Sequence, residues 1–128
     1  MIVDSLLAER GVAVDDDVRR ILEMLPIRLG EAGLHVEIKK RGYFGKVLRA
    51  SQGPVFFDAL PARHWVRFYF SRAANGLPGL AWDRLRDAFA EAEQRPKDLV
   101  VSIRLRDKDE AGRLCSMIAA VVSPGKGS

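Results

Sequence analysis

The chain is poor in the residues that build disulfide frameworks and metal sites. Its 128 residues include one cysteine, Cys115, and two histidines, His35 and His64. One cysteine excludes a disulfide within a single chain. A zinc site needs three or four ligands, and neither histidine has enough Cys, Asp or Glu neighbours at ligand spacing to supply them. We therefore predict no metal site and no cofactor.

Catalytic and membrane signals are also missing from the sequence. No serine lies in the elbow motif of an activated nucleophile, and no apolar run approaches the roughly 18 residues of a membrane span. Asp4 stands where a signal peptide would carry positive charge. We expect a cytoplasmic protein without membrane contact. We name no catalytic residue, and we favour a non-enzymatic role while leaving enzymatic activity open.

The remaining composition is that of an ordinary globular domain. Hydrophobic residues make up 48% of the chain and charged residues 30%, with a net charge of +4. This balance predicts a real hydrophobic core, and the positive charge slightly favours anionic partners. We expect one domain over residues 1–122. The Ser-, Pro- and Gly-containing segment 123–128 reads as a flexible tail.

Apolar residues at three- and four-residue spacing predict helices at both ends of the chain and before the last strand. A short helix covers residues 3–10, and a second opens at Asp15–Asp17, whose carboxylates favour a helix start. Pro26 either kinks this second helix or starts another. A third helix spans residues 81–94. A last helix follows Asp107 and Glu110, which have capping-box spacing, and buries Cys115 on its apolar side.

Alternation of apolar and polar residues predicts about five strands. Four follow one another through short turns, at residues 34–39, 46–50, 55–59 and 64–71, and a fifth spans residues 99–106 with Leu99 on its core side. Residues 42–45, which include Tyr43 and Phe44, read as a hairpin tip. Strands grouped apart from helices indicate an α+β fold. We predict a two-layer sandwich in which a mainly antiparallel sheet carries helices on one face, in the order α-α-β-β-β-β-α-β-α.

The strand at residues 64–71 carries the clearest hint of function. Val66, Phe68 and Phe70 point to one side, as a core requires, whereas Trp65, Arg67 and Tyr69 point to the other. If helices cover the first side, a row of rings and cations faces solvent. Assuming that the first, fourth and fifth strands are neighbours, the candidate binding surface comprises Trp65, Arg67, Tyr69, Lys39, Arg41, Arg104 and Arg106.

This surface supports two kinds of binding. An exposed patch of this sort marks a macromolecular contact, and we favour a small binding or accessory module that acts through a protein partner or forms a homo-oligomer through the open sheet face. The alternative is single-stranded nucleic acid, because rings stack on bases while Lys and Arg meet phosphates.

An enzyme is the least favoured interpretation. Glu37-Ile38-Lys39 fits the E-x-K element of metal-dependent nucleases. That chemistry needs a second carboxylate on a nearby strand to share the cation, and Asp58 is the one candidate. Since three-residue matches arise often by chance, a half-solvated strand explains this alternation better.

Overall fold

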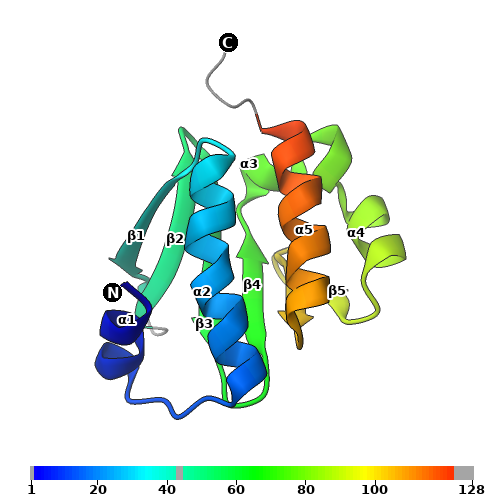
Figure 1. The fold of residues 1–128 in the computed structure, drawn as a ribbon. Coiled ribbons are helices and arrows are strands. Elements are labelled where there is room, and N and C mark those ends of the chain that lie inside the picture. The colour runs from blue at the N-terminus through cyan, green and yellow to red at the C-terminus, as the bar shows by residue number, and fades with distance from the viewer. Residues whose placement is uncertain (1, 43–44, 123–128) are drawn as a thin grey trace.

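The computed structural model describes residues 2–42 and 45–122, and it confirms an α+β fold in which helices pack against an open antiparallel sheet (Figure 1). The predicted hairpin tip at Tyr43 and Phe44 and the predicted tail at residues 123–128 lie outside the described residues. No helix within the described ranges is long and apolar enough to cross a membrane.

Within the described residues the sheet contains six strands, one more than the sequence indicates. Neighbouring strands are antiparallel throughout and follow the order β1-β2-β3-β4-β6-β5. The first four form a meander in sequence order, as predicted. The strands are β1 (His35–Lys40), β2 (Lys46–Gln52), β3 (Val55–Pro61), β4 (Val66–Phe70), β5 (Ala92–Gln94) and β6 (Val101–Leu105).

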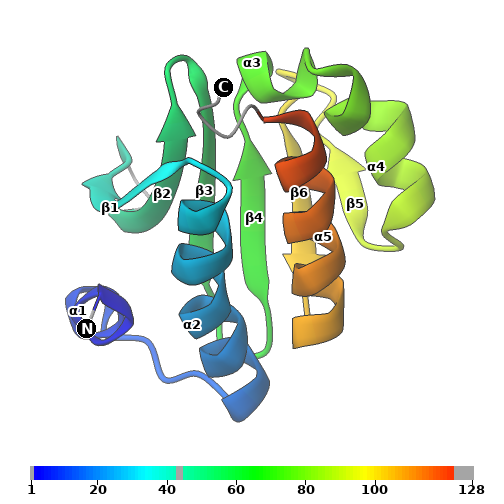
Figure 2. The ribbon, with the colours of Figure 1, turned by 45° about the horizontal axis from the view of Figure 1, so that its top comes forward.

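The long helices cover one face of this sheet. Helices α2 and α5 lie side by side across it, α1 lies near β1 and β2, and α4 lies beside β5 (Figures 1 and 2). The helical elements are α1 (Ile2–Arg10), α2 (Asp16–Glu31), α3 (Arg72–Asn75), the 3₁₀ turn η2 (Pro78–Leu80), α4 (Trp82–Ala88) and α5 (Lys108–Val121).

The hydrophobic core lies between the helices and the sheet. Phe57, Phe68 and Phe70 lie at its centre, with ring centroids 5.5–5.6 Å apart. Val66, Phe68 and Phe70 therefore face the helices, as the alternation predicts, and so do Val101 and Ile103 of β6. We call the opposite side of the sheet the open face. It carries the strand residues that alternate with the core-facing ones.

The predicted helix over residues 81–94 is wrong in its second half. Helix α4 ends at Ala88, and Phe89 takes extended backbone angles (φ −132°, ψ 123°). Ala92–Gln94 then pair with β6 as the edge strand β5. Leu85 and Phe89 are buried as the helical spacing requires. Beyond Phe89, pairing with β6 overrides helix propensity. Without β5, strand β6 would have no neighbour on the side away from β4.

Leu99 also departs from its predicted place in the core. It precedes β6, and its side chain is 61% exposed. Arg95 and Asp98 form a two-pronged ion pair across this loop, and the Leu99 amide donates to the Arg95 carbonyl. This tight turn holds Leu99 at φ 61°, in the left-handed region that branched side chains disfavour.

The predicted helix starts are confirmed. The Asp15 side chain accepts a hydrogen bond from the Val18 amide at 2.9 Å and caps α2. The Asp107 side chain caps α5 by accepting from the Glu110 amide at 2.9 Å. Helix α2 continues through Pro26 to Glu31, so the proline does not start a separate helix.

Candidate functional site

The open face is organised by the strand register. One row of side chains crosses the whole sheet, because Glu37 pairs with Arg49, Arg49 with Asp58, Asp58 with Tyr69, Tyr69 with Ser102, and Ser102 with Glu93. Paired residues project from the same side of a sheet. Acidic and basic side chains are therefore mixed along this row, whereas the sequence led us to expect a mainly cationic face.

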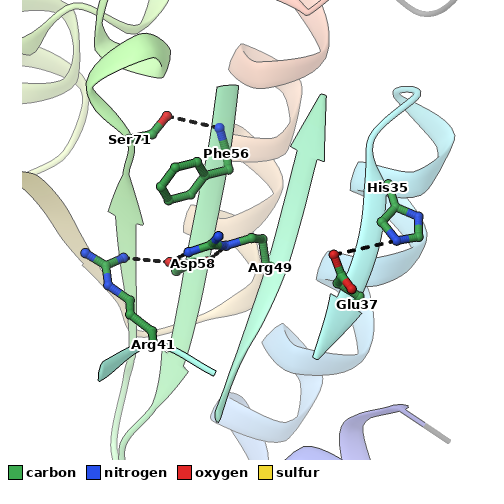
Figure 3. A network of polar contacts seen from close by, with 7 residues as sticks. All are labelled: His35, Glu37, Arg41, Arg49, Phe56, Asp58 and Ser71. Carbon is green, nitrogen blue, oxygen red and sulfur yellow. Dashed lines mark hydrogen bonds and ion pairs between the residues drawn. The ribbon is translucent and has the colours of Figure 1, made fainter. Parts of the chain in front are cut away.

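A buried carboxylate lies in the middle of the open face. The Asp58 side chain is fully buried, yet it accepts three hydrogen bonds from guanidinium groups. Arg49 donates to both of its oxygens, at 2.7 and 2.8 Å, and Arg41 donates to Oδ2 at 2.6 Å (Figure 3). The hydrogen bonds to Asp58 raise the pKa of Arg49. Two charged donors compensate the burial of one carboxylate, as buried charge requires.

Tyr69 corrects the expectation of an exposed aromatic row. It projects from the open face, but it is only 7% exposed. The Arg41 guanidinium lies 4.9 Å from its ring centroid. Tyr69 also belongs to a small apolar cluster with Val47 and Leu60, whose register positions put them on the same face. The ring is thus part of a second, minor core and offers little surface for stacking.

Trp65 is partly exposed on the open face, as is Phe56 of β3, whose ring centroid lies 4.0 Å from the Arg49 guanidinium carbon. It lies in the short loop between β3 and β4 and directly precedes β4. Strand β4 begins at Val66, two residues later than the sequence predicts. The guanidinium carbons of Arg104 and Arg106 lie 5.2 and 5.0 Å from its ring. Cation–π contacts at this range contribute about 0.5–1 kcal/mol each at exposed sites and favour this orientation of the indole. The structure thus brings three of the predicted surface residues together.

Two glutamates that the sequence interpretation placed on a helix accompany these arginines. Glu91 forms a two-pronged pair with Arg106 and lies 3.8 Å from Arg104. Glu93 accepts a hydrogen bond from Arg67 at 3.0 Å. The hydrogen bonds from Arg106 lower the pKa of Glu91, and the same bonds raise the pKa of Arg106. The arginine row is therefore neutralised in part by carboxylates from β5 and the turn before it.

Lys39 lies apart from the other predicted surface residues. We assumed that the first predicted strand neighbours the fourth, but β2 and β3 separate β1 from β4. Lys39 is exposed on β1, and it forms no ion pair within the part of the chain that the structure describes. Arg41 does reach the centre of the face, because it continues beyond β1 and its side chain turns back onto Asp58.

A small pocket opens on the face between β4 and the β5–β6 hairpin, with a volume of about 190 Å³. Ser102 lines the pocket and is 4% exposed, and no hydrogen bond of its hydroxyl is found among the described residues. Arg67 and Arg95 bring two guanidinium groups to the rim, where Arg67 donates to Glu93 and Arg95 donates to both oxygens of Asp98. The Arg95 hydrogen bonds lower the pKa of Asp98 to about 2. The charges around the pocket are therefore balanced, and the pocket suits a small polar group.

The arrangement does not favour metal-dependent hydrolysis. Glu37 and Asp58 share the open face, as a nuclease site would require, but Arg49 lies between them in the register and occupies both Asp58 oxygens. Glu37 lies 3.7 Å from His35 (Figure 3). In residues 2–42 and 45–122, no group of three or more His, Cys, Asp or Glu side chains could hold a metal ion.

The sequence prediction of the surface omitted Arg49, Glu91 and Glu93. The sequence carries a signal for Arg49 but none for the two glutamates. Arg49 has the parity of the open face in a predicted strand, so it could have been paired with Glu37 from alternation alone. Glu91 and Glu93 could not, because Ala92–Gln94 lack the β-branched and aromatic residues that mark strands.

Comparison with known proteins adds no further assignment. No protein-family model matches the chain, and neither the curated proteins nor the solved structures contain a significant match to it.

Proposed function

We propose that this chain is a small non-enzymatic binding module that docks a protein partner on its open sheet face. The observation that carries the proposal is the partly exposed Trp65 ring, held by two guanidinium groups that are themselves fixed by Glu91. Tryptophan and arginine dominate the energetics of protein interfaces. A ring that is already oriented loses little conformational entropy on binding. The cytoplasmic location expected from the sequence remains part of this proposal.

The charge distribution favours a polypeptide over a nucleic acid. Arg67, Arg104 and Arg106 each face a carboxylate, which would repel a phosphate backbone. Tyr69 is buried and cannot stack on a base. Mixed charge of this kind instead suits a protein surface that presents both signs.

The pocket beside Arg67 indicates what the partner contributes. Its volume of about 190 Å³ accommodates a single side chain. The paired guanidinium groups of Arg67 and Arg95, their carboxylate partners and the Ser102 hydroxyl supply both donors and acceptors there. We therefore expect the partner to insert an uncharged polar side chain such as Asn or Gln while an apolar part of its surface covers Trp65.

Site-specific photo-crosslinking in cells tests this proposal. A benzophenone amino acid replaces the exposed Lys97, next to the pocket, or Arg20 on α2 as a matched position on the helix side. We expect a defined protein adduct from the Lys97 position and none from the Arg20 position. Adding Trp65→Ala should weaken binding of the identified partner about 30-fold or more, as loss of an interface hot spot does.

Two results would contradict the proposal. Equal adducts from both positions, or an adduct that Trp65→Ala leaves unchanged, would remove the open face as the docking surface. Trp65→Phe serves as the control for folding, because it keeps an aromatic ring beside Arg104 and Arg106. If labelled single-stranded DNA instead binds, with affinity falling by about tenfold or more as salt rises from 50 to 200 mM, nucleic acid becomes the better assignment.

A further inference from the structure

Among the described residues, strand β1 ends the sheet on one side and has no neighbouring strand beyond it. It is the terminal strand in the order β1-β2-β3-β4-β6-β5 and spans six residues. The other terminal strand, β5, has only three residues and leads into Pro96. In Figures 1 and 2, β1 forms one margin of the sheet. A long open edge is a template for pairing with another chain.

The backbone groups available on this edge follow from the hairpin geometry. The Arg41 amide donates to the Gly45 carbonyl at 2.7 Å, so the Arg41 backbone faces β2. Backbone groups alternate in direction along a strand. Glu37 and Lys39 therefore also face β2. Val36, Ile38 and Lys40 turn their amides and carbonyls outward, and within the described residues these groups have no backbone partner.

We propose that β1 pairs antiparallel with β1 of a second copy of this chain, across a twofold axis at Ile38. In this register Ile38 lies opposite Ile38 of the second copy, and Val36 lies opposite Lys40. Each of these pairs joins outward-facing backbone groups, which gives about six interchain hydrogen bonds.

Charge complementarity selects this register among those that the backbone allows. With the axis at Ile38, Glu37 lies opposite Lys39 of the second copy, twice per dimer. An axis at Glu37 or at Lys39 would place like charges directly opposite one another, and an axis at Lys40 would place Lys39 opposite Arg41. An axis at Val36 would place Glu37 opposite His35 but would leave Lys39 and Lys40 with no strand residue opposite them. The axis at Ile38 therefore pairs the most strand residues and the most opposite charges.

The exposed side chains of β1 fit this contact. Lys39 is exposed and forms no ion pair with the described residues, and Glu37 keeps a side chain that is 40% exposed. On the helix side, Val36 and Ile38 are only partly buried against the core. Pairing would complete their burial and give Lys39 a carboxylate partner.

This dimer would place both open faces on the same side of one continuous sheet. Directly opposed residues in antiparallel strands project from the same face, so the two Trp65 sites would be presented together. The dimer does not depend on what those sites bind, and its test is separate.

Charge reversal on β1 tests the register by sedimentation equilibrium. We expect the wild-type chain to dimerise, and Glu37→Lys or Lys39→Glu alone to weaken the dimer about tenfold, since each turns two attractive pairs into repulsive ones. The double swap Glu37→Lys with Lys39→Glu should restore wild-type affinity. Asp87→Lys on α4 is the matched control, because its side chain is 80% exposed and distant from β1 in sequence and in the fold.

Disulfide trapping gives a second measurement that does not require a strong dimer. The variant Glu37→Cys/Lys39→Cys should form an interchain disulfide under mild oxidation, because directly opposed cross-strand residues meet the distance requirement. Lys39→Cys alone should remain reduced, since it faces position 37 of the second copy. A wild-type chain that sediments as a monomer at every concentration, or a double swap that fails to restore a dimer lost in both single variants, would overturn the proposal.

Discussion

Asp58 shows how one buried residue organises the open face. Its carboxylate joins Arg49 from the neighbouring strand to Arg41 from the β1–β2 connection, and Arg41 in turn covers Tyr69. Alternation correctly predicted the side of the sheet on which Tyr69 lies. It could not predict the burial of the ring, because that depends on where a long side chain from a different strand folds back.

At the level of this residue, we expect Asp58→Asn to lower the free energy of unfolding by about 3 kcal/mol, since it leaves two guanidinium groups without their countercharge. Urea denaturation followed by circular dichroism measures the change. Asp87→Asn, an exposed carboxamide substitution on α4, should stay within about 0.5 kcal/mol of wild type. Equal effects of the two substitutions would show that the Asp58 cluster contributes nothing specific to stability.

At the level of elements, the region between β4 and β6 was the least predictable. Trp82, Leu85, Phe89 and Ala92 have perfect helical spacing, and all four do contact the core. The helix nevertheless stops at Ala88, where the Arg113 side chain donates to the last carbonyl at 2.8 Å and lies over the Phe89 ring. Spacing records which residues are buried. It does not record whether a helix or an edge strand buries them, and here the partner strand decides.

Replacing two glycines by alanine should change the stability of the protein in opposite directions. A Cβ at Gly79 in η2 would lie 2.2 Å from the Val121 side chain of α5, so Gly79→Ala should destabilise the protein by about 1–3 kcal/mol. A Cβ at Gly30 in α2 meets nothing within 4 Å. Gly30→Ala should therefore stabilise the protein by about 0.5–1 kcal/mol through helix propensity. Thermal unfolding of both variants checks this, and a stabilised Gly79→Ala variant would refute the close contact between η2 and α5.

At the scale of the whole molecule, the two-layer α+β architecture and the four-strand meander were predictable. Periodicity separates strands from helices, and short turns force neighbouring strands together. The neighbours of the last strand were not predictable, because residues 71–100 could return to either edge of the meander. That one choice places β6 beside β4, and it brings Arg104 and Arg106 to Trp65 while leaving Lys39 at the far margin.

The reactivity of the Cys115 thiol measures whether α5 stays packed on the sheet. Burial in α5 leaves it 2% exposed and raises the pKa of its thiol to about 11. The reactive thiolate is therefore scarce at pH 8, and we expect alkylation in native buffer to run at least about 100-fold slower than in concentrated urea. Mass spectrometry of timed samples measures both rates. Rapid alkylation without urea would mean that α5 detaches from the sheet while the remainder stays folded.

The strand order also bears on the kinetics of folding. Strands β1 to β4 are joined by short connections and can assemble as successive hairpins, each closing a small loop at little entropic cost. Strand β6 must instead find β4 across residues 71–100, which is the most demanding loop closure in the sheet. We therefore expect the N-terminal meander to acquire protection from hydrogen exchange early in refolding, with β5, β6 and α5 following.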